Sequence, residues 1–193
     1  MESEGKEPPS VAAAEAKAEA AGCGEFRKKM KVLAAVDESE GSLHALSWAL
    51  DNLFPSSSGD SPAAASLGRL ILLHAQQPLQ HFMHPVGPSI YATSSVFESV
   101  RKAQEENSHH LLERAARLCS SKAPLVKTET VIAEGDPKET ICQVAEQMDV
   151  DLLVVGSRGL SKIKRAILGS ASDYCAHHAK CPVLIVKPPK GNN

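Results

Sequence analysis

The chain has 193 residues, of which 42% are hydrophobic and 23% charged, and its formal net charge is −2. This length and composition predict one globular domain, and the 4% share of aromatic residues predicts an aliphatic core. The nearly balanced charge argues against a protein that covers nucleic acid or an anionic membrane with a whole face, so we expect small molecules or proteins as partners. No apolar run approaches the roughly 20 residues of a transmembrane helix.

Residues 1–28 are rich in Ala and Glu and poor in bulky apolar side chains, which predicts a disordered tail. This segment lacks the uninterrupted apolar core of a secretory signal, and its acidic residues are unlike an organelle transit peptide. The five cysteines of the chain include no CxxC pair, which favours a reducing compartment. We therefore expect a cytoplasmic protein, with the nucleus left open, whose folded domain spans 29–188 and is followed by a short tail, 189–193.

The folded part begins with a continuous apolar segment, 30–36, which is typical of a strand covered on both faces. Ser39 then offers an N-cap, and leucines at three- and four-residue spacing predict an amphipathic helix that ends before Pro55. These leucines are Leu43, Leu46, Leu50 and Leu53. Segment 55–68 is rich in Ser, Ala, Gly and Pro and predicts a loop, and 69–75 predicts a second strand.

The connection 76–95 is long for a compact domain and carries three prolines, Pro78, Pro85 and Pro88. Because it leaves the carboxyl end of a strand, where α/β proteins bind ligands, we expect a mobile flap near a site. A long helix is expected over about 96–119. Its apolar residues fall on one face: Phe97, Val100, Leu111, Ala115 and Leu118.

A third strand is expected at 126–133. Asp136 then supplies an N-cap, Pro137 occupies the first helical position, and Glu139 stands three residues after the cap. The helix that follows turns three apolar side chains inward: Ile141, Val144 and Met148. A strand at 152–155, a short helix at 172–179 and a last strand at 181–187 complete the pattern.

Strands that alternate with helices indicate an α/β fold with a doubly wound five-stranded parallel sheet and helices on both faces. If the strand order is 3-2-1-4-5, the winding reverses between strands one and four. A crevice then opens at the carboxyl ends of these two strands. Those ends carry Asp37 and Gly156.

The loop after the fourth strand has an uncommon glycine pattern: Gly156-Ser157-Arg158-Gly159, nine further residues, and then Gly169-Ser170. A glycine turn that leads into a helix gathers unpaired backbone N–H groups, which attract phosphate oxygens. Four cations and no carboxylate lie within this loop, namely Arg158, Lys162, Lys164 and Arg165. The pattern favours an anion-binding loop, and the alternative is a solvated basic loop whose glycines only supply positive φ.

Asp37 directly follows the first strand, where a carboxylate can bind a ribose or a divalent cation. Its alternative role is to cap the next helix, and position alone does not separate the two. The motifs GxxxxGK[ST] and GxGxxG are both absent. The group Cys175, His177, His178 and Cys181 matches no established zinc spacing, so we expect no metal there.

Four sequence blocks together resemble the universal stress protein family of the plant type over residues 29–188. They are Val36-Asp37-Glu38-Ser39-Glu40, Leu73-His74-Ala75, Gly135-Asp136-Pro137, and the glycine loop with its Gly169-Ser170 end. In that family the pattern G2xG9xG followed by Ser or Thr marks members that bind ATP, and this chain matches it without insertion. The resemblance therefore implies an adenine nucleotide, ATP or AMP, bound together with Mg²⁺.

The resemblance also implies a role for particular residues. Asp37 would bind the ribose or its Mg²⁺, with Ala35 beside it, and the backbone at Ala75 would meet the adenine. The phosphates would be wrapped by Gly156, Ser157, Arg158, Gly159, Leu160, Ser161 and Lys162, and capped by Gly169, Ser170, Ala171 and Ser172. Family members dimerise through the last strand, so a homodimer is implied as well, with no nucleic acid or membrane partner.

Three functions follow as alternatives. The first is a nucleotide-dependent stress-response or signalling module with at most slow hydrolysis, because no residue near the loop is an obvious general base and His74 sits within a strand. The second is an adenine-nucleotide hydrolase or transferase, whose SGGxDS and HxGH signatures are absent here. The third is a holdase-like chaperone or interaction protein for which the nucleotide is incidental. The Ala-rich tail and the apolar flap favour this alternative.

Overall fold

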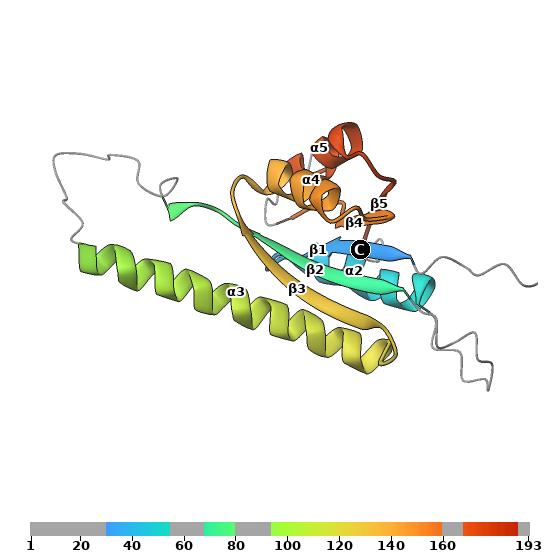
Figure 1. The fold of residues 1–193 in the computed structure, drawn as a ribbon, viewed down its shortest axis with the longest axis horizontal. Coiled ribbons are helices and arrows are strands. Elements are labelled where there is room, and N and C mark those ends of the chain that lie inside the picture. The colour runs from blue at the N-terminus through green and yellow to red at the C-terminus, as the bar shows by residue number, and fades with distance from the viewer. Residues whose placement is uncertain (1–29, 55–67, 80–93, 160–167, 189–193) are drawn as a thin grey trace, which may run out of the picture.

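The computed structural model describes residues 30–54, 68–79, 94–159 and 168–188. Five strands form one sheet in the order β3-β2-β1-β4-β5, and every adjacent pair is parallel. The predicted strand order and the doubly wound fold are therefore confirmed (Figure 1).

The elements lie where the apolar pattern predicts them, with ends that differ by a few residues. The strands are β1 (Lys31–Ala35), β2 (Arg69–Gln76), β3 (Lys127–Glu134), β4 (Leu152–Gly156) and β5 (Val183–Val186). The helices are α2 (Glu40–Leu53), α3 (Ser94–Lys122), α4 (Pro137–Gln147) and α5 (Ser170–His178). The last helix begins at Ser170 rather than at 172, so its first turn joins the glycine loop directly.

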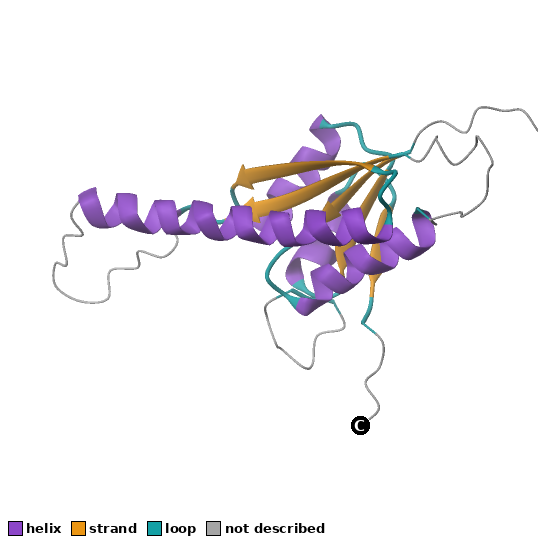
Figure 2. Cartoon of the chain, turned by 90° about the horizontal axis from the view of Figure 1, so that it is seen from below, coloured by secondary structure: helices purple, strands orange, loops and turns teal. Residues whose placement is uncertain are grey.

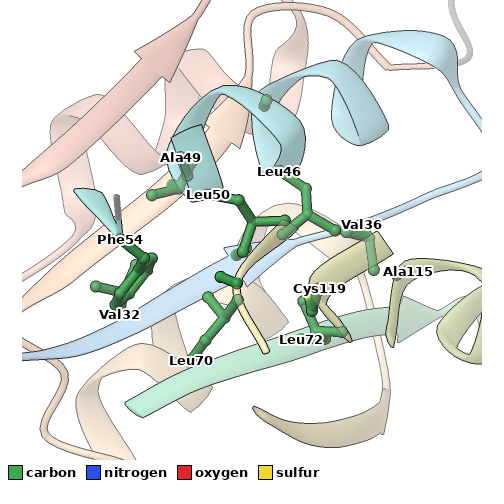
Figure 3. Close-up of a cluster of buried hydrophobic side chains, with 14 of the residues drawn as sticks. Val32, Val36, Leu46, Ala49, Leu50, Phe54, Leu70, Leu72, Ala115 and Cys119 are labelled. Atoms are coloured by element: carbon green, nitrogen blue, oxygen red, sulfur yellow. The ribbon is translucent and has the colours of Figure 1, made fainter. Parts of the chain in front are cut away.

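Helices cover both faces of the sheet and create two hydrophobic clusters. Val32 and Ala34 of β1 point to the face that α2 and α3 cover, where they pack with Leu46, Leu50 and Leu72 (Figure 3). Leu33, between them, points to the opposite face, which α4 and α5 cover. This alternation explains why the central strands are continuous apolar runs, since both of their faces are buried.

Two predicted N-caps are present, and they fix where α2 and α4 begin. The Oγ of Ser39 accepts a hydrogen bond from the backbone N–H of Ser42 at 3.2 Å. Asp136 Oδ1 accepts one from the N–H of Lys138 at 3.1 Å, and Pro137 follows at the start of α4. Each cap satisfies a backbone donor that a helix leaves unpaired in its first turn.

The apolar face of the long helix is buried over its C-terminal half only. Leu111 and Ala115 are buried, whereas Phe97 and Val100 are 37% and 48% exposed. With 29 residues α3 is about 44 Å long, and the eight residues of β2 span only about 26 Å. The N-terminal half of α3 therefore runs past the strands (Figure 2).

Several predictions lie outside the described residues: the tail 1–28, nearly all of the loop 55–68, most of the flap 76–95, and the C-terminal tail 189–193. Among the helices of the described segments, none combines the length and apolar character that a membrane span needs.

Candidate functional site

Asp37 lies at the carboxyl end of β1, where a dense set of hydrogen bonds holds it. Its Oδ1 accepts from the backbone N–H of Ser39 at 3.0 Å and from the Ser39 hydroxyl. The main chain of Asp37 also bonds to Ser42 Oγ, through its N–H at 3.0 Å and its carbonyl at 2.9 Å. Oδ1 thus bonds the residues at the start of α2, which agrees with the alternative role of Asp37 at the helix cap. These bonds also hold the side chain in one orientation.

The second carboxylate oxygen of Asp37 faces the glycine loop. A Cβ placed on Gly159 would lie 2.8 Å from Asp37 Oδ2, which is closer than real side chains approach. The loop after β4 therefore meets the residue after β1 by direct backbone approach. Asp37 and the glycine loop, the two features predicted from the sequence, therefore lie side by side where the winding of the sheet reverses. The strand order requires this arrangement, because β1 and β4 are neighbours.

Glycines also bring the loop against the start of α2. A Cβ on Gly156 would lie 2.8 Å from the carbonyl oxygen of Gly41, and a Cβ on Gly41 would lie 2.5 Å from that of Arg158. Sequence reasoning missed Gly41 and also the buried Ser42 beside it. A glycine at the second position of an amphipathic helix was the available signal for Gly41, because glycine weakens a helix unless close approach requires it.

The two ends of the glycine motif are bonded to each other. The carbonyl oxygen of Ser157 accepts from the N–H of Gly169 at 2.8 Å and from Ser172 Oγ at 3.1 Å. Ser157 also donates its N–H to the carbonyl of Val186 at 2.8 Å, and both Ser157 and Ser172 are buried. The first turn of α5 is therefore held beside the end of β4, with Ser170 exposed and Ala171 half-buried.

Gly169 is the N-cap of α5 and supplies no side-chain hydrogen bond to the helix start. The amides of that first turn are thus the kind of donors that an anion can satisfy. Arg158, which is exposed, lies in the same loop. Leu160, Ser161 and Lys162 fall outside the described residues, as do Lys164 and Arg165, so their predicted phosphate contacts stay predictions.

Two small residues lie near the carboxyl ends of β1 and β2. Ala35 at the end of β1 and Ala75 in β2 are both half-buried and pack against the cluster under α4 and α5. Next to Ala75, His74 places its Nδ1 at 3.0 Å from the carbonyl oxygen of Val36. That contact gives His74 a structural role at the end of β1.

Within the described segments, no three His, Cys, Asp or Glu side chains converge so as to hold a metal ion. His177 and His178 are exposed. Their Nδ1 atoms are in hydrogen-bond contact with carbonyl oxygens of the same helix, at 2.8 Å from Asp173 O and 2.9 Å from Tyr174 O respectively. Cys175, on the same helix, is buried. The magnesium assigned to Asp37 would come with the nucleotide and stays a prediction.

Residues 29–187 match the Universal stress protein family. The chain is 34% identical over 143 residues to a "Universal stress protein A-like protein" of Arabidopsis thaliana, covering 74% of this chain and 76% of that protein. It is 30% identical over 157 residues to the "Universal stress protein YxiE" of Bacillus subtilis, covering 81% and 98%.

Among solved structures, a universal stress protein family protein from Arabidopsis thaliana with AMP bound is 30% identical, with a TM-score of 0.57 and coverage of 83% of this chain and 93% of that one. A universal stress protein in complex with cAMP is 27% identical, with a TM-score of 0.54 and coverage of 81% and 96%. On its sequence and its fold, the chain belongs to the universal stress protein family.

Proposed function

We propose that this protein is an ATP-binding universal stress protein, a nucleotide-dependent stress-response or signalling module with at most slow hydrolysis. The observation that carries the proposal is the direct approach of Gly159 to the Asp37 carboxylate at the reversal of the sheet. Two structural relatives are described as holding AMP and cAMP, which supports an adenine nucleotide as the ligand class.

The arrangement of polar groups favours one orientation of the ligand. Asp37 Oδ2 can accept from a ribose hydroxyl or bind the Mg²⁺ that accompanies the phosphates. The N–H groups of Ser170 and Ala171 in the first turn of α5 suit the phosphates, and Ala35 and Ala75 have small side chains that would not obstruct a flat base. Leu160, Ser161 and Lys162 would complete the phosphate loop.

Slow hydrolysis follows from the groups that surround Asp37. A general base must reach the attacking water and accept its proton. Asp37 already accepts two hydrogen bonds from Ser39, and the Nδ1 atom of His74 is in hydrogen-bond contact with the carbonyl oxygen of Val36. Neither residue is placed as a base poised for efficient turnover.

The holdase alternative is favoured by a different observation. Val96, Phe97 and Val100 are large apolar side chains that are all more than a third exposed on the N-terminal half of α3. Exposed apolar surface of this kind can bind unfolded chains. Light scattering of a heat-aggregating client, with and without ATP, distinguishes the two functions, because a holdase suppresses aggregation even when no nucleotide is present.

We further propose a cytoplasmic homodimer that associates through β5, which is an edge strand of the described sheet. An apolar edge strand exposes unpaired backbone groups to solvent, and pairing with a second copy covers them. The residues of β5 are Val183, Leu184, Ile185 and Val186.

Isothermal titration calorimetry and thermal unfolding test the nucleotide proposal. ATP with Mg²⁺ should give saturable heat, and at a hundredfold excess over Kd it should raise Tm by about 5 °C or more. Arg158→Ala should weaken ATP more than AMP, because AMP lacks the outer phosphates that a loop cation contacts. Arg114→Ala, an exposed arginine on α3, is the control and should change neither affinity. Absence of both heat and a Tm shift at millimolar nucleotide would reject the proposal.

A further inference from the structure

Two cysteines far apart in the sequence lie in contact on the face of the sheet opposite α2 and α3. The Sγ atoms of Cys142 on α4 and Cys175 on α5 are 3.7 Å apart. The two helices pack side by side over this face (Figure 1). Cys175 is fully buried, whereas Cys142 is half-buried and is the more exposed of the two.

We propose that Cys142 and Cys175 form an oxidation site, at which a hydroperoxide closes a reversible disulfide between α4 and α5. The sulfur atoms are already in contact, so bond formation requires them to approach by less than 2 Å, which a change in side-chain torsions can supply. The two thiols come from different helices, so the bond would fix α5 to α4. The proposal does not depend on nucleotide binding.

The chemistry balances with the hydroperoxide as the only oxidant. The thiolate of Cys142 attacks the terminal oxygen of the hydroperoxide, the O–O bond breaks, and Cys142 becomes a sulfenic acid while an alcohol or water leaves. The sulfur of Cys175 then attacks the sulfur of Cys142. The hydroxide that is expelled takes the proton of Cys175 and leaves as water. Overall, two thiols and one hydroperoxide give one disulfide, one alcohol or water, and one water.

Burial assigns the two thiols their order of reaction. Burial raises the pKa of Cys175 to about 12, so this thiol stays protonated and serves as the second, resolving group. Burial also raises the pKa of Cys142, while the hydrogen bond with Cys175 partly opposes that rise. Since the thiolate is the reactive form, oxidation should be slow at neutral pH and accelerate roughly tenfold per pH unit below the pKa of Cys142.

Cys181, which precedes β5, belongs to the same hydrophobic cluster and is the competing partner. Trypsin separates the three thiols, because Cys142, Cys175 and Cys181 fall in the fragments 139–158, 166–180 and 181–190. The full chain is reduced, freed of reductant, treated with hydrogen peroxide, blocked with N-ethylmaleimide and digested without reduction. Mass spectrometry should find 139–158 linked to 166–180, with loss of two hydrogen atoms and disappearance of the link after dithiothreitol.

Variants give the test its controls. Cys142→Ser and Cys175→Ser should each abolish the cross-link, whereas Cys119→Ala should leave it unchanged, because Cys119 lies in the other hydrophobic cluster. Cys181→Ala should also leave it unchanged. A dominant link between 139–158 and 181–190, or Cys142 carried to sulfinic acid while Cys175 remains a free thiol, would overturn the proposal.

Discussion

Gly159 lies so close to Asp37 that a single added methyl group would meet the carboxylate, 2.8 Å from Oδ2. Three helices and three strands separate these residues in the sequence, and they meet because β1 and β4 are neighbours in the sheet. Asp37 Oδ1 accepts a hydrogen bond from Ser39, and Oδ2 lies beside the backbone of Gly159. With no side chain in the way, that backbone can approach a ligand. The glycine is thus required by the site rather than by a turn.

Gly159→Ala should therefore weaken nucleotide binding about tenfold, because the new Cβ must push the loop away from the carboxylate. Gly159 is exposed, so Tm without nucleotide should change little. Calorimetry and thermal unfolding measure the two effects on the same samples. Asp37→Ala provides the matched background, in which Gly159→Ala should cost much less affinity. An equal cost in both backgrounds would show that the glycine acts elsewhere.

Ser172→Ala should lower the free energy of unfolding by about 1 kcal/mol, because it removes a buried hydroxyl that bonds the carbonyls of Ser157 and Gly169. The matched control is Ser120→Ala, an exposed serine on α3 whose hydroxyl bonds Ala116 O at 3.1 Å. That change should stay within about 0.5 kcal/mol. Equilibrium urea unfolding compares the two variants, and equal losses would contradict the role given to Ser172.

The buried thiol of Cys119 should make the protein less stable at alkaline pH. Burial raises its pKa from 9.0 to about 11, and a hydrogen bond with Thr128 opposes part of that rise. Between these two values the unfolded chain has lost the proton while the folded chain keeps it, so the free energy of unfolding falls as pH rises. The contribution is fully present below pH 9.

Chemical unfolding across this pH window checks the effect. Cys119→Val keeps an apolar side chain of similar size and has no proton to lose, so its stability should fall less steeply with pH. Cys175, whose pKa is raised in the same direction, stays in both proteins and acts as a common background. Parallel pH dependence in the two proteins would contradict this assignment.

Much of the fold could be predicted because the signals are local. Apolar runs without alternation identify β1 and β4 as strands covered on both faces, and Pro137 after Asp136 fixes the start of α4. The order of the strands followed from the alternation with helices and from the family resemblance. The same local pattern places Phe97 and Val100 on one face with Leu111, but only Leu111 is buried, because periodicity does not say how far a sheet extends beneath a helix.

The sequence predicted the two residues of the site at the strand ends, and it did not predict the residues of α2 that lie between them. Asp37 lies just beyond β1 and Gly156 is the last residue of β4, so topology brings them together. Ser42 bonds the main chain of Asp37 locally, five residues away in the sequence. Gly41, in contrast, meets Gly156 and Arg158 because α2 packs across the sheet. Short sequence patterns do not encode such tertiary contacts.

The proposed dimer can be tested with two variants of Val183, one that removes its backbone N–H and one that removes only side-chain volume. The carbonyls of Pro182 and Val186 accept hydrogen bonds from Leu153 and Ser157 on the β4 side, at 2.9 and 2.8 Å. Because successive residues of a strand direct their peptide groups to opposite edges, Val183 points its N–H to the outer edge. Val183→Pro should then keep the fold, since proline is tolerated at the first residue of a strand, and yet yield a monomer in sedimentation velocity. Val183→Ala removes side-chain volume but retains the N–H, so it should remain a dimer. A dimer that survives Val183→Pro would place the interface on another surface.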